Sequence, residues 1–154
     1  MHDNTRDYSP EELATAVSAA MFERDAAANH LGIAIEETRP GYARARMQVR
    51  DSMLNSHGTC HGGMLFALAD TAFAYACNSY NENAVAAGCA IDFLAPGQAG
   101  DTLTAVAIER SRAGRTGIYD VDIRDSQGNV IAVFRGRSHR IKGHTIGHPT
   151  TENA

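Results

Sequence analysis

One almost wholly apolar stretch constrains this chain more than any other feature; it spans residues 61–77 and reads HGGMLFALADTAFAYAC. It is too long for one strand, has no period-two pattern and is rich in Leu, Met, Ala and Phe, so we predict a helix of about five turns. A helix that is apolar nearly all round must be surrounded by protein. Asp70 is its single acidic residue, and a buried carboxylate is costly unless it is paired or used.

The remainder of the chain predicts one more helix and several strands. Ser9, Pro10 and Glu12 have the order of a helix start, and the apolar spacing that follows predicts an amphipathic helix over residues 9–29. Turn residues separate six strand-like segments, which are 32–39, 42–50, 84–94, 101–111, 116–125 and 129–141. The order helix, two strands, buried helix and four strands predicts an α+β hot-dog arrangement, in which one antiparallel sheet wraps around one long helix.

The length of 154 residues fits a single domain. We expect residues 1–8 to be a flexible N-terminus, residues 9–142 to form the domain, and the patternless residues 143–154 to be a disordered tail. One wrapped sheet leaves part of the helix and the sheet edges without cover. A homodimer is the obvious way to cover them.

Composition argues against several classes of protein. The net charge of −4 argues against general nucleic-acid binding, and no apolar run approaches the roughly 20 residues that span a membrane. Residues 2–8 are polar, so we expect no signal peptide and a cytoplasmic location. The three cysteines, Cys60, Cys77 and Cys89, fall in no CxxC spacing, and we interpret them as free thiols that fill the core.

Two glycines stand where the loop enters the predicted buried helix. There the first N–H groups have no partner within the helix, and Gly62 or Gly63 would let a ligand carbonyl approach them closely. Asp70 follows Gly62 at a spacing of roughly 12 Å along a helix and about 80° around it. The two residues cannot act on one carbonyl within one chain, so a catalytic interpretation requires a dimer with antiparallel buried helices. Alternatively, the glycines only relieve packing, and Asp70 and Thr71 only bind a neighbouring strand.

Other chemistries are weakly supported. His57, Cys60 and His61 resemble half of a zinc site, but no nearby group completes it, so we expect no metal. The chain has no P-loop, no dinucleotide fingerprint and no G-x-S-x-G elbow. Residues 110–142 contain eight basic and three acidic residues, which suits a phosphate-bearing ligand, although solvated strand faces would have the same composition.

Four segments carry a resemblance to a known family: LNSHGTCHGGMLFALADTAFAYACNS, AIDFLAPGQAGDTLTA, GIYDVDI and VFRGRSHRI. With their HGG-x(6)-D spacing, they resemble the phenylacetic-acid-degradation (PaaI-type) branch of the hot-dog acyl-CoA thioesterases over most of residues 30–142. The resemblance implies a homotetramer, built as a dimer of dimers, that hydrolyses phenylacetyl-CoA and its ring-hydroxylated relatives in aerobic phenylacetate degradation. It also implies no metal and no cofactor, since CoA is part of the substrate.

The resemblance implies catalytic roles for five residues. Asp70 matches the catalytic carboxylate, which acts either as general base on water or as nucleophile. Gly62 matches the backbone amide that polarises the thioester carbonyl. Asn55 and His61 match the polar residues that flank the thioester, and Thr71 matches the helix residue beside the carboxylate.

Three more residues are candidates for contacts with CoA. Arg115, on a predicted turn, and Arg140, near the end of the last strand, are candidates for holding the CoA phosphates, and Gly63 for a contact near the thioester. Two alternative functions stay open. His61 and Asp70 could serve as acid and base in a hot-dog acyl-CoA hydratase or dehydratase, or the chain could be a non-catalytic acyl-CoA binding module.

Overall fold

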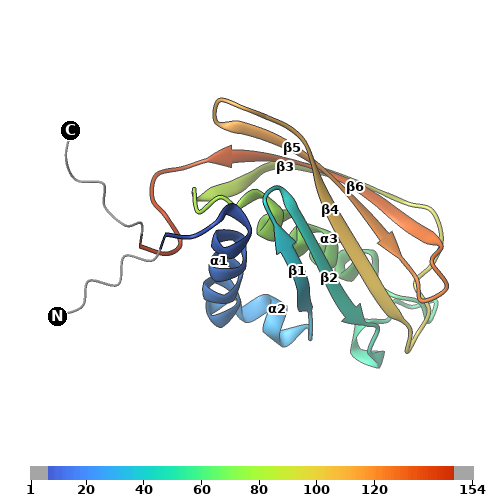
Figure 1. Cartoon of the computed structure of the whole chain (residues 1–154). Helices are drawn as coiled ribbons and strands as arrows, with labels where there is room; N and C mark the ends of the chain where they lie inside the picture. Colours follow the sequence, from blue (N-terminus) through green and yellow to red (C-terminus); the bar gives the residue numbers. More distant parts are fainter. Residues whose placement is uncertain (1–6, 148–154) are drawn as a thin grey trace, which may run out of the picture.

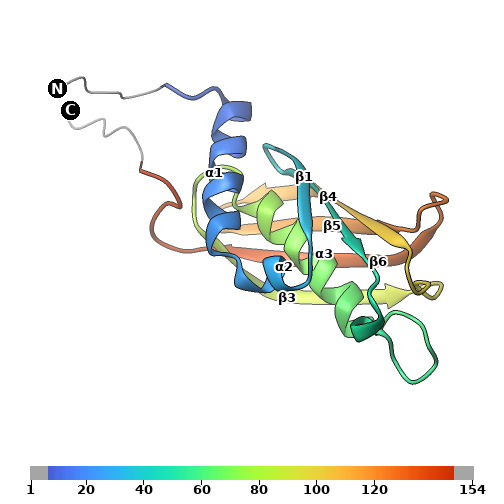
Figure 2. The same ribbon diagram turned by 90° about the horizontal axis from the view of Figure 1, so that it is seen from below.

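One antiparallel sheet of six strands wraps around a long helix, α3, in the computed structural model, which describes residues 7–147 (Figure 1 and Figure 2). The strand order in the sheet is β1-β2-β4-β5-β6-β3. In chain order these elements are β1 (Ala34–Arg39), β2 (Tyr42–Gln48), α3 (Gly62–Cys77), β3 (Ala84–Phe93), β4 (Thr102–Ala113), β5 (Thr116–Arg124) and β6 (Val130–Arg140). The predicted hot-dog arrangement is confirmed.

Alternation of apolar and polar residues determines which face of each strand meets α3. In β2 the residues on the inner face are fully buried; they are Ala43, Ala45 and Met47. In β5 the inner residues Tyr119, Val121 and Ile123 are buried, whereas Asp120 and Asp122 between them are partly exposed on the other face. Because a one-residue slip would turn every inner side chain outward, this pattern fixes the register of the strands.

The predicted helix over residues 9–29 is two helices, α1 (Pro10–Arg24) and α2 (Ala26–His30). The Ser9 side chain caps α1 as predicted, accepting a hydrogen bond from the Glu12 N–H. The break comes at Asp25, whose carboxylate accepts a hydrogen bond from the Ala28 N–H at 3.0 Å and begins α2. Since an Asp side chain can replace a helical carbonyl as acceptor, it favours a helix end over continuation. Tyr75 of α3 donates its hydroxyl hydrogen to the same carboxylate at 3.2 Å.

The prediction of a disordered tail is wrong for residues 143–147. Asn81, in the turn after α3, accepts hydrogen bonds on Oδ1 from the N–H groups of Thr145 and Ile146, both at 3.0 Å, and its Nδ2 donates to the Ile146 carbonyl. Asn81 is buried at a φ of +61°, a conformation that Asn tolerates better than most residues. Such pairing between a side chain and a distant backbone leaves no periodic signal in the sequence. Residues 1–6 and 148–154 lie outside the described residues.

Part of the hot-dog core is left open by a single chain. A stripe along α3 is exposed or only partly buried, and its residues are Gly63, Ala67, Asp70, Thr71 and Ala74. The edge strand β3 is mostly exposed although most of its residues are apolar. The expectation that one wrapped sheet leaves part of the helix and an edge uncovered is confirmed.

Candidate active site

Asp70 is partly buried in the middle of α3. Its carboxylate accepts no hydrogen bond and forms no ion pair within the described residues 7–147. Burial raises the pKa of the Asp70 carboxyl above the ordinary aspartate value. The alternative in which Asp70 only binds a neighbouring strand has no hydrogen bond to support it, so the carboxylate is available for chemistry.

Two thiols lie close enough to Asp70 to feel its charge. Burial, reinforced by the negative charge of Asp70, raises the pKa of Cys77 to about 12 and holds the pKa of Cys89 above the usual thiol value. Cys60 and Cys77 are buried as predicted, but Cys89 is exposed, and its interpretation as a core residue is wrong because β3 is an edge strand. A thiol with a raised pKa is a poor nucleophile near neutral pH, so Cys77 and Cys89 are poor candidates for the nucleophile.

The first residues of α3 present one free backbone N–H. His61 is the N-cap, and its Nδ1 accepts a hydrogen bond from the Gly63 N–H at 2.8 Å. An accepting ring nitrogen carries no hydrogen, so the neutral His61 ring carries its hydrogen on Nε2. The Gly63 N–H is therefore occupied, and the predicted contact of Gly63 with CoA cannot use it. The Gly62 N–H has no acceptor among residues 7–147 and can donate to a ligand oxygen.

Gly62 and Asp70 lie on the same unbroken helix, roughly 12 Å apart along its axis at 1.5 Å per residue. The cavity beside Gly62 is not lined by Asp70. Within one chain the Gly62 amide and the Asp70 carboxylate therefore stay apart. The spacing of the two residues in the sequence predicts this separation.

Asn55 organises the loop that leads into α3. Its Oδ1 accepts hydrogen bonds from the N–H groups of His57 at 2.9 Å and Thr59 at 3.2 Å, and its Nδ2 donates to Thr59 Oγ1 at 3.1 Å. One Nδ2 hydrogen of Asn55 is left for a ligand. Thr71 donates its hydroxyl hydrogen to the Ala67 carbonyl of its own helix at 2.7 Å, so its oxygen can serve only as an acceptor.

Phe93 lies against Gly62, and the sequence did not predict it as a residue of the site. An ideal Cβ built on Gly62 would lie 3.0 Å from Phe93 Cζ, so the ring covers Gly62. Phe93 and Leu94 are 53% and 60% exposed, and both line a cavity of about 410 Å³ that also includes Asn55 and Gly62. The signal that could have found Phe93 is the pair of large apolar residues at the exposed end of an edge strand.

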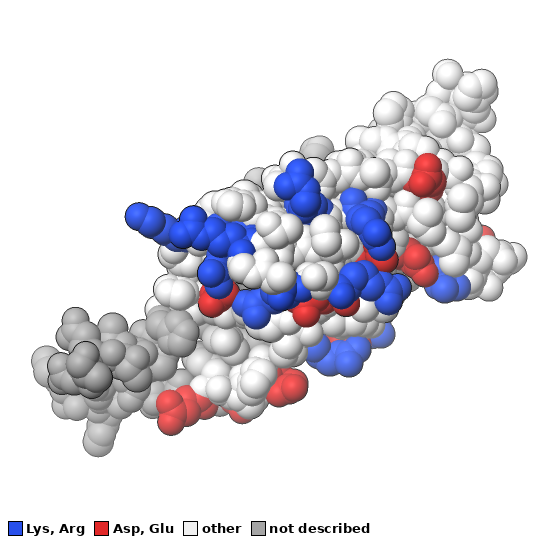
Figure 3. All heavy atoms as spheres, turned by 90° about the horizontal axis from the view of Figure 1, so that it is seen from above, with Lys and Arg blue, Asp and Glu red and all other residues white. Residues whose placement is uncertain are grey.

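Basic side chains gather on the outer face of the sheet, with acidic side chains between them (Figure 3). Arg110 and Arg135 both bind Asp120, at 2.9 Å and 2.7 Å. The hydrogen bond from Arg135 and the charges of both arginines hold the pKa of Asp120 below the usual aspartate range, although partial burial opposes them. These arginines are neutralised across the strands, so the outer face is not a simple phosphate-binding surface.

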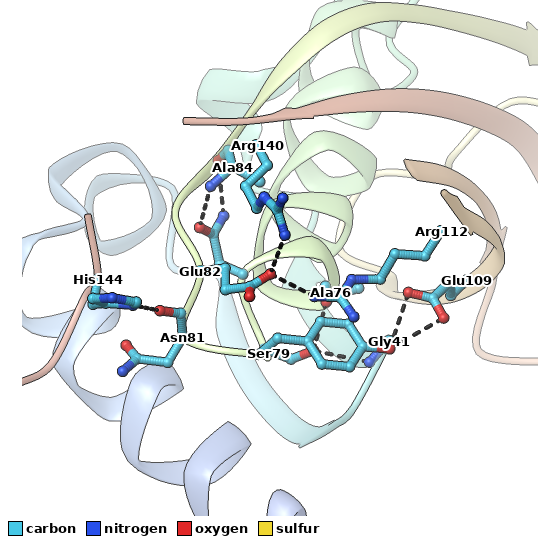
Figure 4. A network of polar contacts seen from close by, with 12 residues as sticks. Gly41, Ala76, Ser79, Asn81, Glu82, Ala84, Glu109, Arg112, Arg140 and His144 are labelled. Carbon is cyan, nitrogen blue, oxygen red and sulfur yellow. Dashed lines mark hydrogen bonds and ion pairs between the residues drawn. The ribbon is translucent and has the colours of Figure 1, made fainter. Parts of the chain in front are cut away.

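A second basic cluster lies near the C-terminal end of α3 (Figure 4). Glu82 binds Arg112 at 2.6 Å and Arg140 at 3.1 Å. Partial burial raises the pKa of Glu82, but the hydrogen bond from Arg140 and the charges of both arginines outweigh it and lower the value. Arg115 and Arg140, the two predicted phosphate contacts, line one small cavity with Arg112 and Glu82. This cavity has three guanidinium groups against one carboxylate.

Within residues 7–147, no three His, Cys, Asp or Glu side chains come close enough together to hold a metal ion. In the same range, no helix combines the length and apolar character needed to cross a membrane.

Comparison with known proteins gives matches over most of the chain. The family model of the thioesterase superfamily matches residues 57–132. The acyl-coenzyme A thioesterase PaaI of Escherichia coli (strain K12) is 56% identical over 128 residues, which are 83% of this chain and 91% of that protein. The solved structure of the E. coli PaaI protein from the phenylacetic acid degradation operon has a TM-score of 0.87 and 53% identity, and the match covers 88% of this chain and 99% of that chain.

A more distant solved structure was determined with a ligand. It is a hypothetical thioesterase of Streptococcus pneumoniae TIGR4 with coenzyme A, which has a TM-score of 0.70 and 27% identity. The match covers 73% of this chain and 90% of that chain.

Proposed function

This chain belongs to the thioesterase superfamily and is an enzyme of that family, and on this premise we propose that it hydrolyses acyl-CoA thioesters to the free acid and CoA. The observation that carries the proposal is the pair of unused groups on α3. The Asp70 carboxylate is partly buried and without a partner among residues 7–147, and the Gly62 N–H at the helix start lacks an acceptor in the same range. A base or nucleophile and an oxyanion donor are the two groups that thioester hydrolysis requires.

The two groups would meet across a homodimer. The partly exposed stripe on α3 contains Asp70 among small residues such as Ala67 and Ala74, which let a second helix approach closely. The exposed edge strand β3 offers further surface for the same contact. If the two α3 helices run antiparallel, Asp70 of one subunit faces Gly62 of the partner subunit, and each dimer has two sites.

Each site would use the carboxylate and the amide in one of two ways. As a general base, Asp70 removes a proton from water, and the oxygen of that water bonds to the thioester carbon. The Gly62 N–H donates to the oxyanion, the C–S bond breaks, and the CoA thiolate takes up the proton. As a nucleophile, Asp70 itself bonds to the carbon, CoA leaves, and water hydrolyses the anhydride. A thiolate leaves readily in both cases, since a thiol has a pKa of about 8.5.

His61 and Asn55 would assist at the thioester. Each has one donor left, the His61 Nε2–H and the second Asn55 Nδ2 hydrogen, and Asn55 lines the same cavity as Gly62. In the hydratase alternative the same His61 would act with Asp70 as acid and base, and the assay below separates the two reactions.

The cluster of Arg112, Arg115 and Arg140 would hold the CoA phosphates. Glu82 binds two of these arginines, which keeps their side chains extended toward one cavity. We place the acyl group among phenylacetyl and ring-hydroxylated phenylacetyl groups, on the likeness to the E. coli protein of the phenylacetic acid degradation operon. The reaction needs no cofactor, and we propose a cytoplasmic dimer of dimers as the working form.

The test is release of free thiol from phenylacetyl-CoA by the wild type and by Asp70→Asn. We expect the substitution to lower kcat by about 10²- to 10⁴-fold, the usual contribution of a general base. Asp122→Asn is the matched control, because Asp122 lies on the outer face of the sheet and forms an exposed ion pair with Arg124. It should retain activity within about twofold.

Three results would contradict the proposal. Undiminished thiol release by Asp70→Asn would exclude the assigned role of the carboxylate. No release from any aryl- or alkyl-acyl-CoA would point to a binding module. Addition of water to an enoyl-CoA without thiol release would point to the hydratase.

A further inference from the structure

The ring of Phe93 covers the Cα of Gly62, the residue whose amide would polarise the thioester, and both residues line one cavity. The separation of 3.0 Å between Phe93 Cζ and an ideal Cβ on Gly62 is tighter than an ordinary contact, so a side chain at position 62 would push the ring aside. The Gly62 N–H itself has no acceptor among residues 7–147. A carbonyl oxygen bound there would lie about 3 Å from the amide nitrogen, and the acyl group would then begin next to the Phe93 ring.

The cavity on this side of Gly62 has the character of a pocket for an apolar group. Its volume of about 410 Å³ is within the usual range for small-molecule sites, and Leu65, Phe93, Leu94 and Pro96 line it. Phe93 and Leu94 expose half or more of their surface although both are large and apolar. Asn55 and Thr59 supply polar groups at the same cavity.

We propose that this cavity receives the acyl group and that Phe93 selects aromatic acyl groups by ring contact. The inference rests on the proposed hydrolysis of acyl-CoA, and it deepens that proposal by naming a specificity-determining residue. A phenylacetyl ring begins two bonds from the carbonyl carbon, which brings it within the 4.5–7 Å that separates the centroids of interacting aromatic rings.

A purely structural role for Phe93 predicts a different result. If the ring only packs on Gly62 and holds the helix start, its loss would slow all substrates to the same degree. The ratio of rates for two acyl groups with the same number and connectivity of carbon atoms separates the two roles. Phenylacetyl and cyclohexylacetyl groups have the same carbon skeleton and differ in aromatic character.

The experiment measures kcat/KM for phenylacetyl-CoA and cyclohexylacetyl-CoA in the wild type, Phe93→Leu, Phe93→Tyr and Ile108→Ala. Phe93→Leu should lower the ratio of the two values by roughly 2- to 10-fold, because an aromatic pair contributes about that factor. Phe93→Tyr keeps the ring and should keep the ratio. Ile108 is exposed on the outer face of the sheet, so Ile108→Ala should also keep it. An unchanged ratio in Phe93→Leu would overturn the inference.

A binding measurement separates this inference from the proposed reaction. The thioethers 2-phenylethyl-CoA and 2-cyclohexylethyl-CoA cannot be hydrolysed, and titration calorimetry gives their affinities for each variant. If the wild type prefers the phenyl compound and Phe93→Leu does not, the inference is supported even if the wild type releases no thiol. Two results would overturn it even if hydrolysis is confirmed. One is that the wild type binds the two thioethers with equal affinity, and the other is that Phe93→Leu keeps the preference of the wild type for the phenyl compound.

Discussion

The His61 ring accepts a hydrogen bond from the Gly63 N–H at 2.8 Å, and this contact begins α3 beside the amide of Gly62. One nitrogen of the ring thus holds the helix start, while the other carries the hydrogen of the neutral ring. If His61 also assists at the thioester, stability and catalysis depend on different atoms of the same side chain.

His61→Ala and His61→Asn separate these two contributions. His61→Ala removes the N-cap and should lower the free energy of unfolding by about 1 kcal/mol. Asn is a good N-cap and should restore the stability, as measured by urea unfolding. We expect His61→Asn to lose about tenfold in kcat/KM all the same, because the Nε2 donor is gone. Wild-type activity in His61→Asn would mean that the ring acts only as a cap.

Asp70 should make both stability and activity depend on pH. Burial raises the pKa of Asp70 in the folded state, so the folded chain keeps a proton that the unfolded chain releases. Stability contributed by this group is therefore present at low pH and falls as pH rises from the ordinary aspartate value through the raised one. Activity should rise through the same window, because the reaction needs the carboxylate.

Asp70→Asn should remove this dependence and be more stable than the wild type at neutral pH. Urea unfolding of both proteins from about pH 4 to pH 7 measures the difference, which should grow with pH. A difference that stays constant over this range would show that the carboxyl titrates alike in both states.

Activity should return when two inactive variants share a dimer. Asp70→Ala removes the carboxylate, and Gly62→Pro removes the amide hydrogen, which should cost about 10²- to 10³-fold as for other oxyanion donors. In a mixed dimer, one site receives Gly62 and Asp70 intact from different subunits. We expect mixing after subunit exchange to restore activity toward about half of the wild-type value per mixed dimer.

Gly62→Ala controls for crowding in this experiment. Pro fits the first position of a helix, but its Cβ meets the Phe93 ring, as does that of Ala. Gly62→Ala keeps the N–H, so its loss of activity measures crowding alone. Mass spectrometry identifies the mixed dimers. If they form and remain inactive, the two subunits do not share a site.

The carboxylate of Glu109 should contribute to the stability of the fold. Glu109 accepts hydrogen bonds from the hydroxyls of Tyr119 at 2.9 Å and Tyr80 at 3.0 Å. Glu109→Leu leaves the buried Tyr119 hydroxyl without this acceptor and should cost about 2 kcal/mol in urea unfolding. Adding Tyr119→Phe should recover about 1 kcal/mol, because the stranded hydroxyl is removed. A double variant that is less stable than Glu109→Leu would contradict this account.

Most of the fold could be predicted because apolar residues recur at regular intervals along the strands and the buried helix. Every predicted strand and the buried helix exist, and the alternation through Tyr119, Val121 and Ile123 correctly gives the inner face of β5. The Cys89 error comes from the exposed edge strand β3, and the other two occur where one polar side chain binds the backbone of another residue. Asp25 ends α1 by accepting the Ala28 N–H, and Asn81 pairs with the backbone of residues 145–146. Neither contact produces a periodic pattern of apolar residues in the sequence.

The candidate site was predictable in its chemistry but not in its shape. Asp70 and Gly62 stand out because a carboxylate and a pair of glycines are unusual in an apolar helix. The occupation of the Gly63 N–H by His61 depends on a side-chain rotamer, and the position of Phe93 over Gly62 depends on how β3 crosses the helix start. The spacing of residues in the sequence reveals neither the side-chain rotamer of His61 nor the position of Phe93.

The short side chains on the open stripe of α3 have a consequence for how this enzyme can change over time. In the proposed dimer, Ala67 and Ala74 set the separation of two backbones, and that separation sets the reach from Asp70 to the opposite amide. A larger residue at either position would widen the gap without meeting the substrate. In that dimer, residues that do not meet the substrate would be held under the same selection as Asp70, and an exchange of alanine for valine there would lower activity by separating the two groups.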